Sequence, residues 1–133
     1  MSDITIKHPL KLNLSVIDAE DVLPSFEMSM TITIPHLSGN LEYRADSLWF
    51  ECSKWDAFIK DTSLSDTTTS TLESMCESFK IKLTKKQEKY SFSISCKIKT
   101  LSKGTFNFEV TYELNRDVFL QISKKFEQFP VWW

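Results

Sequence analysis

The chain has 133 residues, of which 41% are hydrophobic and 13% aromatic, with only two glycines and four prolines. This length and composition exclude a disordered chain and predict a single domain over residues 1–133 with its own core. The formal charge is −2, yet residues 1–77 hold 13 acids and 5 bases, whereas residues 78–133 hold 5 acids and 11 bases. The halves predict two surfaces of opposite charge, unless salt bridges between the sheets absorb the difference.

No apolar run approaches the roughly 20 residues that a membrane helix needs, so no contact with a membrane is expected. The N-terminal residues lack the continuous apolar block of a signal peptide. The three cysteines, Cys52, Cys76 and Cys96, are odd in number and widely spaced, which favours reduced thiols over a disulfide framework. We therefore expect a cytoplasmic protein.

Alternation of apolar and polar residues predicts antiparallel strands along most of the chain. In the first half the alternating segments are 10–16, 26–34, 41–45 and 48–50. The inward residues change from odd to even numbers between the last two segments, which predicts a β-bulge near Asp46 and Ser47. The acidic run 18–21 is expected to form a solvated loop.

A helix is predicted over 53–62, where apolar residues recur at helical spacing behind Ser53, a good N-cap. Trp55, on the apolar side of this helix, is assigned to the core. The Ser/Thr-rich stretch that follows is expected to form a loop over 62–70. A weak edge strand or a turn is expected over 71–77.

Alternation returns in the second half of the chain, in the segments 79–83, 90–98 and 106–114. Their short polar connections predict hairpins, with Ile98 opposite Phe106 and a loop of about three residues ending at Gly104. A second helix is predicted over 116–129, with an acid near its start and a proline after its end. The resulting order, ββββα–ββββα, predicts an α+β fold with two antiparallel sheets of about four strands each and two helices.

No residue pattern typical of catalysis, metal binding or cofactor binding is found. His8 and His36 each stand beside a proline, away from any nucleophile motif. The cysteines lack the CxxC spacing of zinc sites, and two glycines are too few for a nucleotide-binding loop. We therefore expect a protein that is not an enzyme and that uses no metal or cofactor.

The basic stretch 80–90 is the best candidate for a nucleic-acid contact, because it contains five lysines. Its aromatic neighbours alternate onto the opposite face, where they are expected in the core and not on a surface that stacks bases. The sequence thus favours a protein with no direct nucleic-acid contact. Binding of single-stranded nucleic acid remains the alternative function.

The acid-rich first half predicts the capture of a basic protein partner, because complementary charge speeds encounter and sets specificity. The expected binding residues are six acids and one aromatic residue: Asp18, Glu20, Asp21, Glu42, Asp46, Trp49 and Glu51. Trp49 falls on the face opposite Leu48 and Phe50. There it is covered by the second helix or by the terminal PVWW, or it is exposed as an anchor. The apolar PVWW leaves a monomer or a weak dimer open.

Three segments carry a resemblance to known proteins: LEYRADSLWFECSKWDAFIKD (41–61), FKIKLTKKQEKYSFSISCKI (79–98) and RDVFLQISKKFEQFPVWW (116–133). They resemble small immunity proteins of bacterial polymorphic-toxin systems, including the WapI-type family and the immunity proteins of contact-dependent growth inhibition. The resemblance covers most of the chain from residue 10 onward. It rests on aromatic and structural positions and transfers no interface residue.

The resemblance implies a cytoplasmic protein that binds and blocks the C-terminal domain of one cognate toxin and protects the cell that produces it. Such toxins are often nucleases, and some are EndoU-type ribonucleases that cut tRNA. The order of strands and helices is also similar to the Whirly fold, which occurs in single-stranded nucleic-acid binders. The nucleic-acid motif of Whirly proteins is not evident in this sequence, and a fold alone does not determine function.

Overall fold

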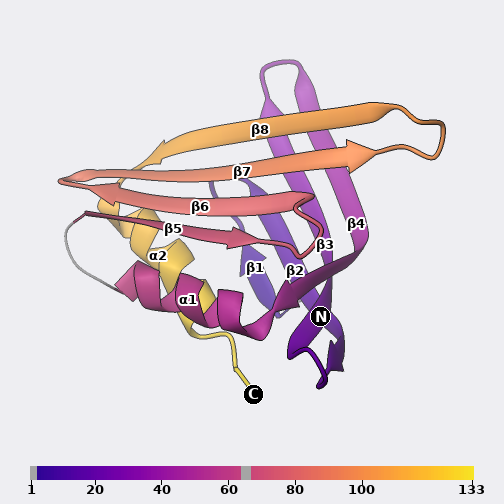
Figure 1. Cartoon of the computed structure of the whole chain (residues 1–133). Helices are drawn as coiled ribbons and strands as arrows, with labels where there is room; N and C mark the ends of the chain where they lie inside the picture. The colour runs from indigo at the N-terminus through magenta and orange to yellow at the C-terminus, as the bar shows by residue number, and fades with distance from the viewer. Residues whose placement is uncertain (1–2, 64–66) are drawn as a thin grey trace.

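The computed structural model describes residues 3–63 and 67–133 and contains two four-stranded antiparallel sheets, each followed by a helix. Sheet A has the strand order β1-β2-β3-β4, and sheet B has the order β5-β6-β7-β8. The expected ββββα–ββββα order and the α+β class are confirmed. In Figure 1 the strands of sheet B run across those of sheet A, which lies behind them.

Sheet A consists of β1 (Ile4–Ile6), β2 (Lys11–Glu20), β3 (Ser25–His36) and β4 (Gly39–Glu51). The bulge predicted in β4 is present. Met28 pairs with Leu48 and Met30 pairs with Ala45, so the single β3 residue between them faces residues 46–47. Two residues opposite one partner turn the following side chains to the other face, which explains the change of inward parity.

A second irregularity, in β2, is not visible in the alternation. Asp18 pairs with Glu27 after a register shift that leaves Ile17 without a partner. Beyond this shift the even-numbered Asp18 and Glu20 lie on the outer face of sheet A, although unbroken alternation would place them inside. The prediction of a solvated loop for the acidic run is therefore wrong as far as Glu20, which ends β2, and the turn occupies residues 21–24.

Sheet B consists of β5 (Thr67–Glu73), β6 (Phe79–Lys86), β7 (Lys89–Lys99) and β8 (Thr105–Leu114). The β7–β8 register is regular and places Ile98 opposite Phe106, as expected. The amide of Thr100 donates a hydrogen bond to the carbonyl of Gly104 (2.8 Å), which closes a hairpin loop of three residues.

The strand β5 corrects the prediction of a loop over 62–70, of which residues 64–66 lie outside the described residues. It pairs with β6 along its whole length. Its inward positions are occupied by Ser70 and Leu72, both buried. Because a small polar residue takes one of these positions, the segment shows little apolar alternation, although threonine is favoured in strands.

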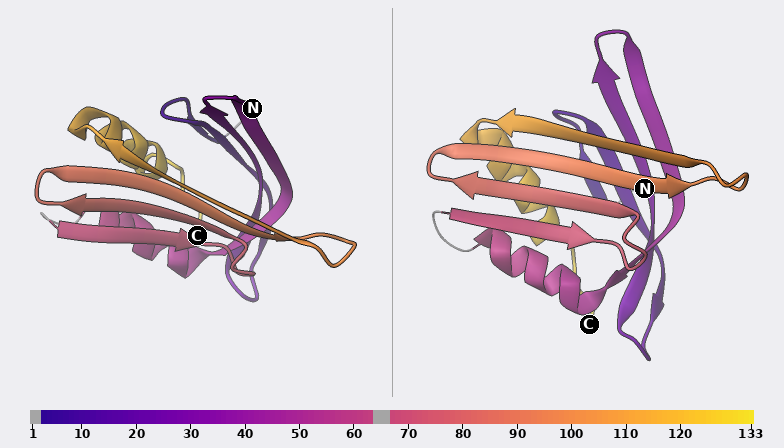
Figure 2. Two further views of the ribbon diagram at one scale, coloured as in Figure 1. Left: turned by 90° about the horizontal axis from the view of Figure 1, so that it is seen from above. Right: turned by 45° about the horizontal axis from the view of Figure 1, so that its top comes forward.

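The two helices are α1 (Cys52–Ser63) and α2 (Arg116–Glu127). Because α1 begins one residue earlier than expected, Ser53 lies inside its first turn and is not its N-cap. The second helix ends at Glu127, two residues before its expected end. Its N-cap is Asn115, whose Oδ1 accepts a hydrogen bond from the amide of Val118 (2.9 Å). In Figures 1 and 2, α1 lies along β5, and α2 crosses the space behind sheet B.

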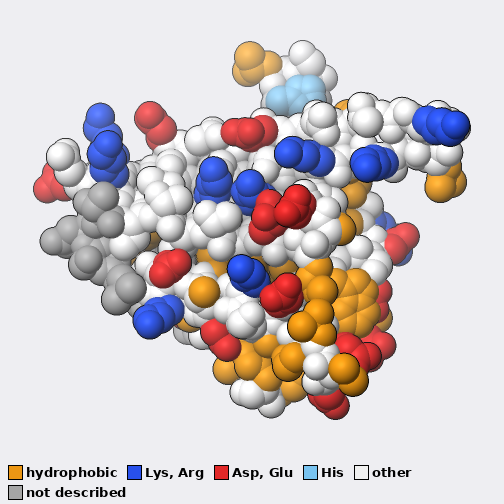
Figure 3. Space-filling model, in the orientation of Figure 1, with side chains coloured by type: hydrophobic (Ala, Val, Ile, Leu, Met, Phe, Trp, Pro, Cys, Tyr) orange, Lys and Arg blue, Asp and Glu red, His pale blue; other side chains and the backbone are white. Residues whose placement is uncertain are grey.

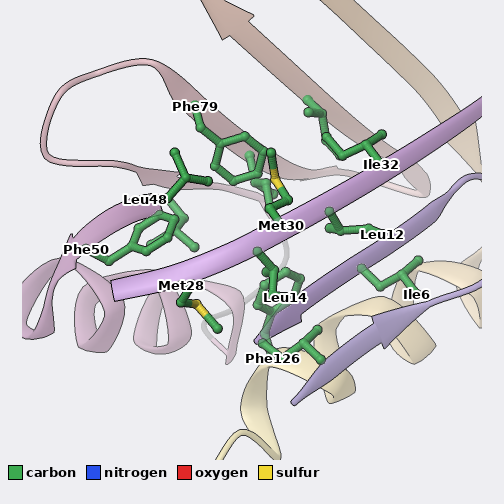
Figure 4. Close-up of a cluster of buried hydrophobic side chains, with 14 of the residues drawn as sticks. Ile6, Leu12, Leu14, Met28, Met30, Ile32, Leu48, Phe50, Phe79 and Phe126 are labelled. Atoms are coloured by element: carbon green, nitrogen blue, oxygen red, sulfur yellow. The ribbon is translucent and has the colours of Figure 1, made fainter. Parts of the chain in front are cut away.

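The core lies between the two sheets and is closed by the helices. Figure 4 shows inward side chains of β1 to β4 converging with Phe79 of β6 and Phe126 of α2. Trp55 and Phe58 of α1 have no exposed surface, which confirms the assignment of Trp55 to the core. Burial of this apolar surface is the main term that holds the sheets together.

The C-terminal residues fold back onto the inner face of sheet A. The ring of Phe26, in β3, lies 6.0 Å from that of Phe129, 5.5 Å from Trp132 and 5.2 Å from Trp133. The indole Nε1 of Trp133 donates hydrogen bonds to both carboxylate oxygens of Asp56 in α1, at 2.9 and 3.0 Å. These contacts join β3, α1 and the last residues of the chain.

Candidate functional site

The register of sheet A brings five of the seven expected binding residues to one end of the sheet. Across the three strands, Asp18 lies opposite Glu27, and Glu27 lies opposite Trp49. Glu20 and Glu51 are the partners of Ser25 in the next row, and Asp21 follows in the turn. Pairing of β2, β3 and β4 therefore brings these residues together from two distant parts of the sequence.

The other two expected residues lie elsewhere. Glu42 pairs with Thr33, six residues from Glu27 along β3, which corresponds to about 20 Å at the rise of a strand. Asp46 is in the β4 bulge, where its Oδ1 lies 2.8 Å from the Nε of Arg44. This pair is largely exposed, so a local base already offsets the charge of Asp46.

The acids at the hairpin end have no such base. In the described ranges 3–63 and 67–133, the ion pairs Arg44–Asp46 and Lys80–Glu73 include none of these acids. The Oδ1 of Asp18 accepts a hydrogen bond from the amide of the next residue, Ala19 (2.8 Å). Like charges directly opposite each other on neighbouring strands destabilise a sheet, and Asp18 and Glu27 form such a pair.

Exposed apolar side chains surround these acids. Ile17, Val22 and Leu23 are 54%, 94% and 50% exposed. In Figure 3, orange side chains stand beside red ones at the lower right, where Figure 1 places the β2–β3 hairpin. We call this region the hairpin-end surface, and it comprises Ile17, Asp18, Glu20, Asp21, Val22, Leu23, Glu27, Trp49 and Glu51.

The hairpin-end surface is tied to the rest of the molecule by backbone hydrogen bonds. The carbonyl of Pro24, in the turn, accepts from the amide of Cys52 at the start of α1 (2.9 Å). The carbonyl of Trp49 accepts from the amide of Met75, after β5 (2.8 Å). The turn of the hairpin is thus fixed at Pro24, while Val22 and Leu23 beside it stay exposed, which suits a rigid contact surface.

Trp49 is half-buried on the outer face of sheet A, beside Glu27. The C-terminal residues contact Phe26, which points to the inner face, so they do not cover Trp49. The second helix also lies on the inner side, because its Phe119 packs on Tyr90 of β7 (4.9 Å). Of the alternatives for Trp49, a partly exposed anchor fits the structure best.

The lysines of the second half lie mainly on the outer face of sheet B. Lys80 and Lys82 of β6 pair with Ser95 and Ser93 of β7, so lysines alternate with small hydroxyl side chains. The Nζ of Lys80 is also 3.3 Å from Glu73 of β5, so cross-strand pairs offset part of this positive charge. The aromatic residues of β6 and β7 point inward, which leaves this face without a stacking platform.

The seven expected binding residues do not include Glu27 or the apolar tip of the hairpin, Val22 and Leu23. Alternation does place Glu27 on the polar side of its strand, but only the register shows that it joins Asp18 to Trp49. Val22 and Leu23 sit in a turn, where no periodicity assigns a face. The sequence signal for them is the presence of two large apolar residues in a short connection between strands.

Neither a metal site nor a membrane span is found in the part of the chain that the structure describes. No group of three or more His, Cys, Asp or Glu side chains among those residues could hold an ion. None of the helices there is both long and apolar enough to cross a membrane. No family model matches the chain, and no curated protein or solved structure matches it either.

Proposed function

We propose that this protein is an immunity protein that binds one cognate toxin domain, a basic nuclease, and neutralises it by covering its active site. It acts in the cytoplasm of the cell that makes it. The observation that carries the proposal is the hairpin-end surface, where acids without ion pairs stand beside exposed apolar side chains. The resemblance of three segments to immunity proteins of polymorphic-toxin systems supports the same function.

A surface of this kind is suited to a basic cleft. Nucleases hold the phosphates of their substrate with Lys and Arg side chains. Carboxylates on neighbouring strands are about 5 Å apart and can take the place of those phosphates. Cations of the partner would also relieve the repulsion between Asp18 and Glu27, and Val22 and Leu23 would exclude water around the charge contacts.

The experiment uses the toxin domain encoded by the gene immediately upstream and follows its cleavage of RNA. An equimolar amount of the purified protein should abolish cleavage. Glu27→Lys should weaken binding at least about tenfold, because it places a positive charge at the centre of the acidic row. The same substitution should stabilise the free protein by about 0.2–1 kcal/mol, since it replaces a repulsive pair with an attractive one.

Glu42→Lys is the matched control, because Glu42 is an exposed acid of the same sheet at its far end. Its affinity should stay within about twofold of the original protein. Full toxin activity in the presence of excess protein would contradict the proposal. A gel shift with single-stranded RNA that weakens with salt and is lost on Lys82→Glu would support the nucleic-acid alternative instead.

A further inference from the structure

The strand β8 is an open edge of sheet B. It pairs with β7 through a regular ten-residue register and has no strand on its other side. Its sequence, TFNFEVTYEL, contains no lysine or proline, and its register shows no bulge. Lysine, proline and bulges, together with other charged side chains, prevent edge strands from pairing with another chain, and of these β8 carries only Glu109 and Glu113.

The remaining sheet edges are protected. β1 has only three residues, and β4 carries a bulge with the Arg44–Asp46 ion pair. β5 runs beside α1, as Figure 1 shows. Among the strands that the structure describes, β8 is therefore the one long edge without a covering element or a local interruption.

The inward side chains of β8 are less buried than those of its neighbour. Phe106 is 45% exposed, and the other inward residues of the strand are all half-buried. On β7, in contrast, Phe92 and Ile94 are fully buried. The inward apolar side chains at the β8 edge of sheet B are thus only partly buried, and one strand added beside β8 would bury more of them.

A strand added beside β8 would pack on the β3–β4 hairpin. In Figures 1 and 2 the β3–β4 hairpin lies in the second layer and extends past β8. The ring of Tyr43, in that hairpin, is 5.9 Å from the ring of Phe108. Leu41, two residues earlier on the same face, is half-buried as well. The hairpin therefore supports apolar side chains beyond the present edge of sheet B.

We propose that the occupant of this edge is a second copy of the chain, and that two β8 strands pair antiparallel about a two-fold axis at Val110. This register places Phe108 opposite Tyr112 and Phe106 opposite Leu114 on the apolar face. On the outer face it places Glu109 opposite Thr111. The two sheets would form one continuous eight-stranded sheet across the dimer.

The charges of β8 select this register among its neighbours. Pairs that keep both faces matched differ by steps of two residues. One step to one side places Glu109 opposite its own copy, and one step to the other side places Glu109 opposite Glu113. Both alternatives put like charges directly opposite each other, which the register centred on Val110 avoids. This self-complementarity favours a second copy over an unrelated strand.

The test measures the dimer dissociation constant by sedimentation over a concentration series, with 15.5 kDa as the monomer mass. Thr111→Glu would place Glu opposite Glu109 at two symmetric positions and should weaken the dimer about tenfold. Thr111→Lys should strengthen it by a similar factor. The double variant Glu109→Thr with Thr111→Glu again places Thr opposite Glu and should restore the original affinity.

Thr69→Glu is the matched control, because Thr69 is an exposed threonine of β5, at the opposite edge of the same sheet. It should leave the dissociation constant unchanged. A chain that stays monomeric at all concentrations would overturn the proposal, as would a dimer that is insensitive to charge at position 111. The inference does not depend on the proposed immunity function, and loss of toxin binding would leave it intact.

Discussion

Replacing Phe26 by alanine should destabilise the fold by about 3–5 kcal/mol, the usual cost of removing a fully buried phenylalanine. The ring has no exposed surface and lies 5.2 Å from that of Trp55 and 5.9 Å from that of Phe50. It also contacts Trp132 and Trp133, so its removal leaves a cavity at the point where β3, α1 and the chain end meet. Total stabilities of such domains are about 5–15 kcal/mol, so the loss is large.

Urea denaturation of the monomer, followed by tryptophan fluorescence, measures this loss. With a slope of about 2 kcal/mol per molar urea, the midpoint should fall by roughly 1.5–2.5 M. Phe106→Ala, at a phenylalanine that is 45% exposed, is the control and should cost less than about 1.5 kcal/mol. Equal losses for the two variants, or a loss below about 1 kcal/mol for Phe26→Ala, would refute the assignment of Phe26 to the centre of the aromatic cluster.

Three further outcomes test the helix cap and the thiols of Cys96 and Cys76. Asn115→Ala removes the cap of α2 and should lower the free energy of unfolding by about 1 kcal/mol, whereas Asn115→Asp should retain it; thermal unfolding measures both. Burial raises the pKa of the Cys96 thiol to about 12. Because the unfolded thiol ionises near pH 9, its contribution to stability is complete below pH 9 and is lost as the pH rises towards 12. Urea midpoints between pH 8 and 11 should therefore fall less in Cys96→Ala. Burial also raises the pKa of Cys76, but hydrogen bonds from Ser78 and Ser74 outweigh it and lower the pKa, so this exposed thiol should react first with a disulfide reagent.

The sequence predicts best those strands in which apolar residues mark the inward face along the whole length of the strand. The β4 bulge was visible because Ala45 and Leu48, on either side of it, are both inward. The β2 irregularity was hidden, since the residues beyond it are acids and one alanine, which carry no apolar signal of their own. β5 was missed for a related reason, because Ser70 is buried without being apolar.

Only part of the candidate site could be predicted from the sequence. Residue type identifies the acids but does not show where they lie in the fold. Asp18 and Glu27 are neighbours through a shifted register, and such shifts depend on backbone geometry that composition does not encode. The same limit applies to Glu42, which was grouped with the others by charge and lies at the far end of the sheet. Alternation predicts on which face of a sheet a side chain lies, but only the register of strand pairing shows which side chains are its neighbours.

The contact between β3 and the chain end also sets the order in which the protein can be completed during synthesis. Phe26 and Trp133 are stacked at 5.2 Å although more than a hundred residues separate them. Ribosomes add about 5–20 residues per second, so Trp133 is synthesised roughly 5–20 seconds after Phe26. During that interval the ring of Phe26 lacks part of its cover, and the nascent first sheet is a natural client for chaperones that shield apolar surface.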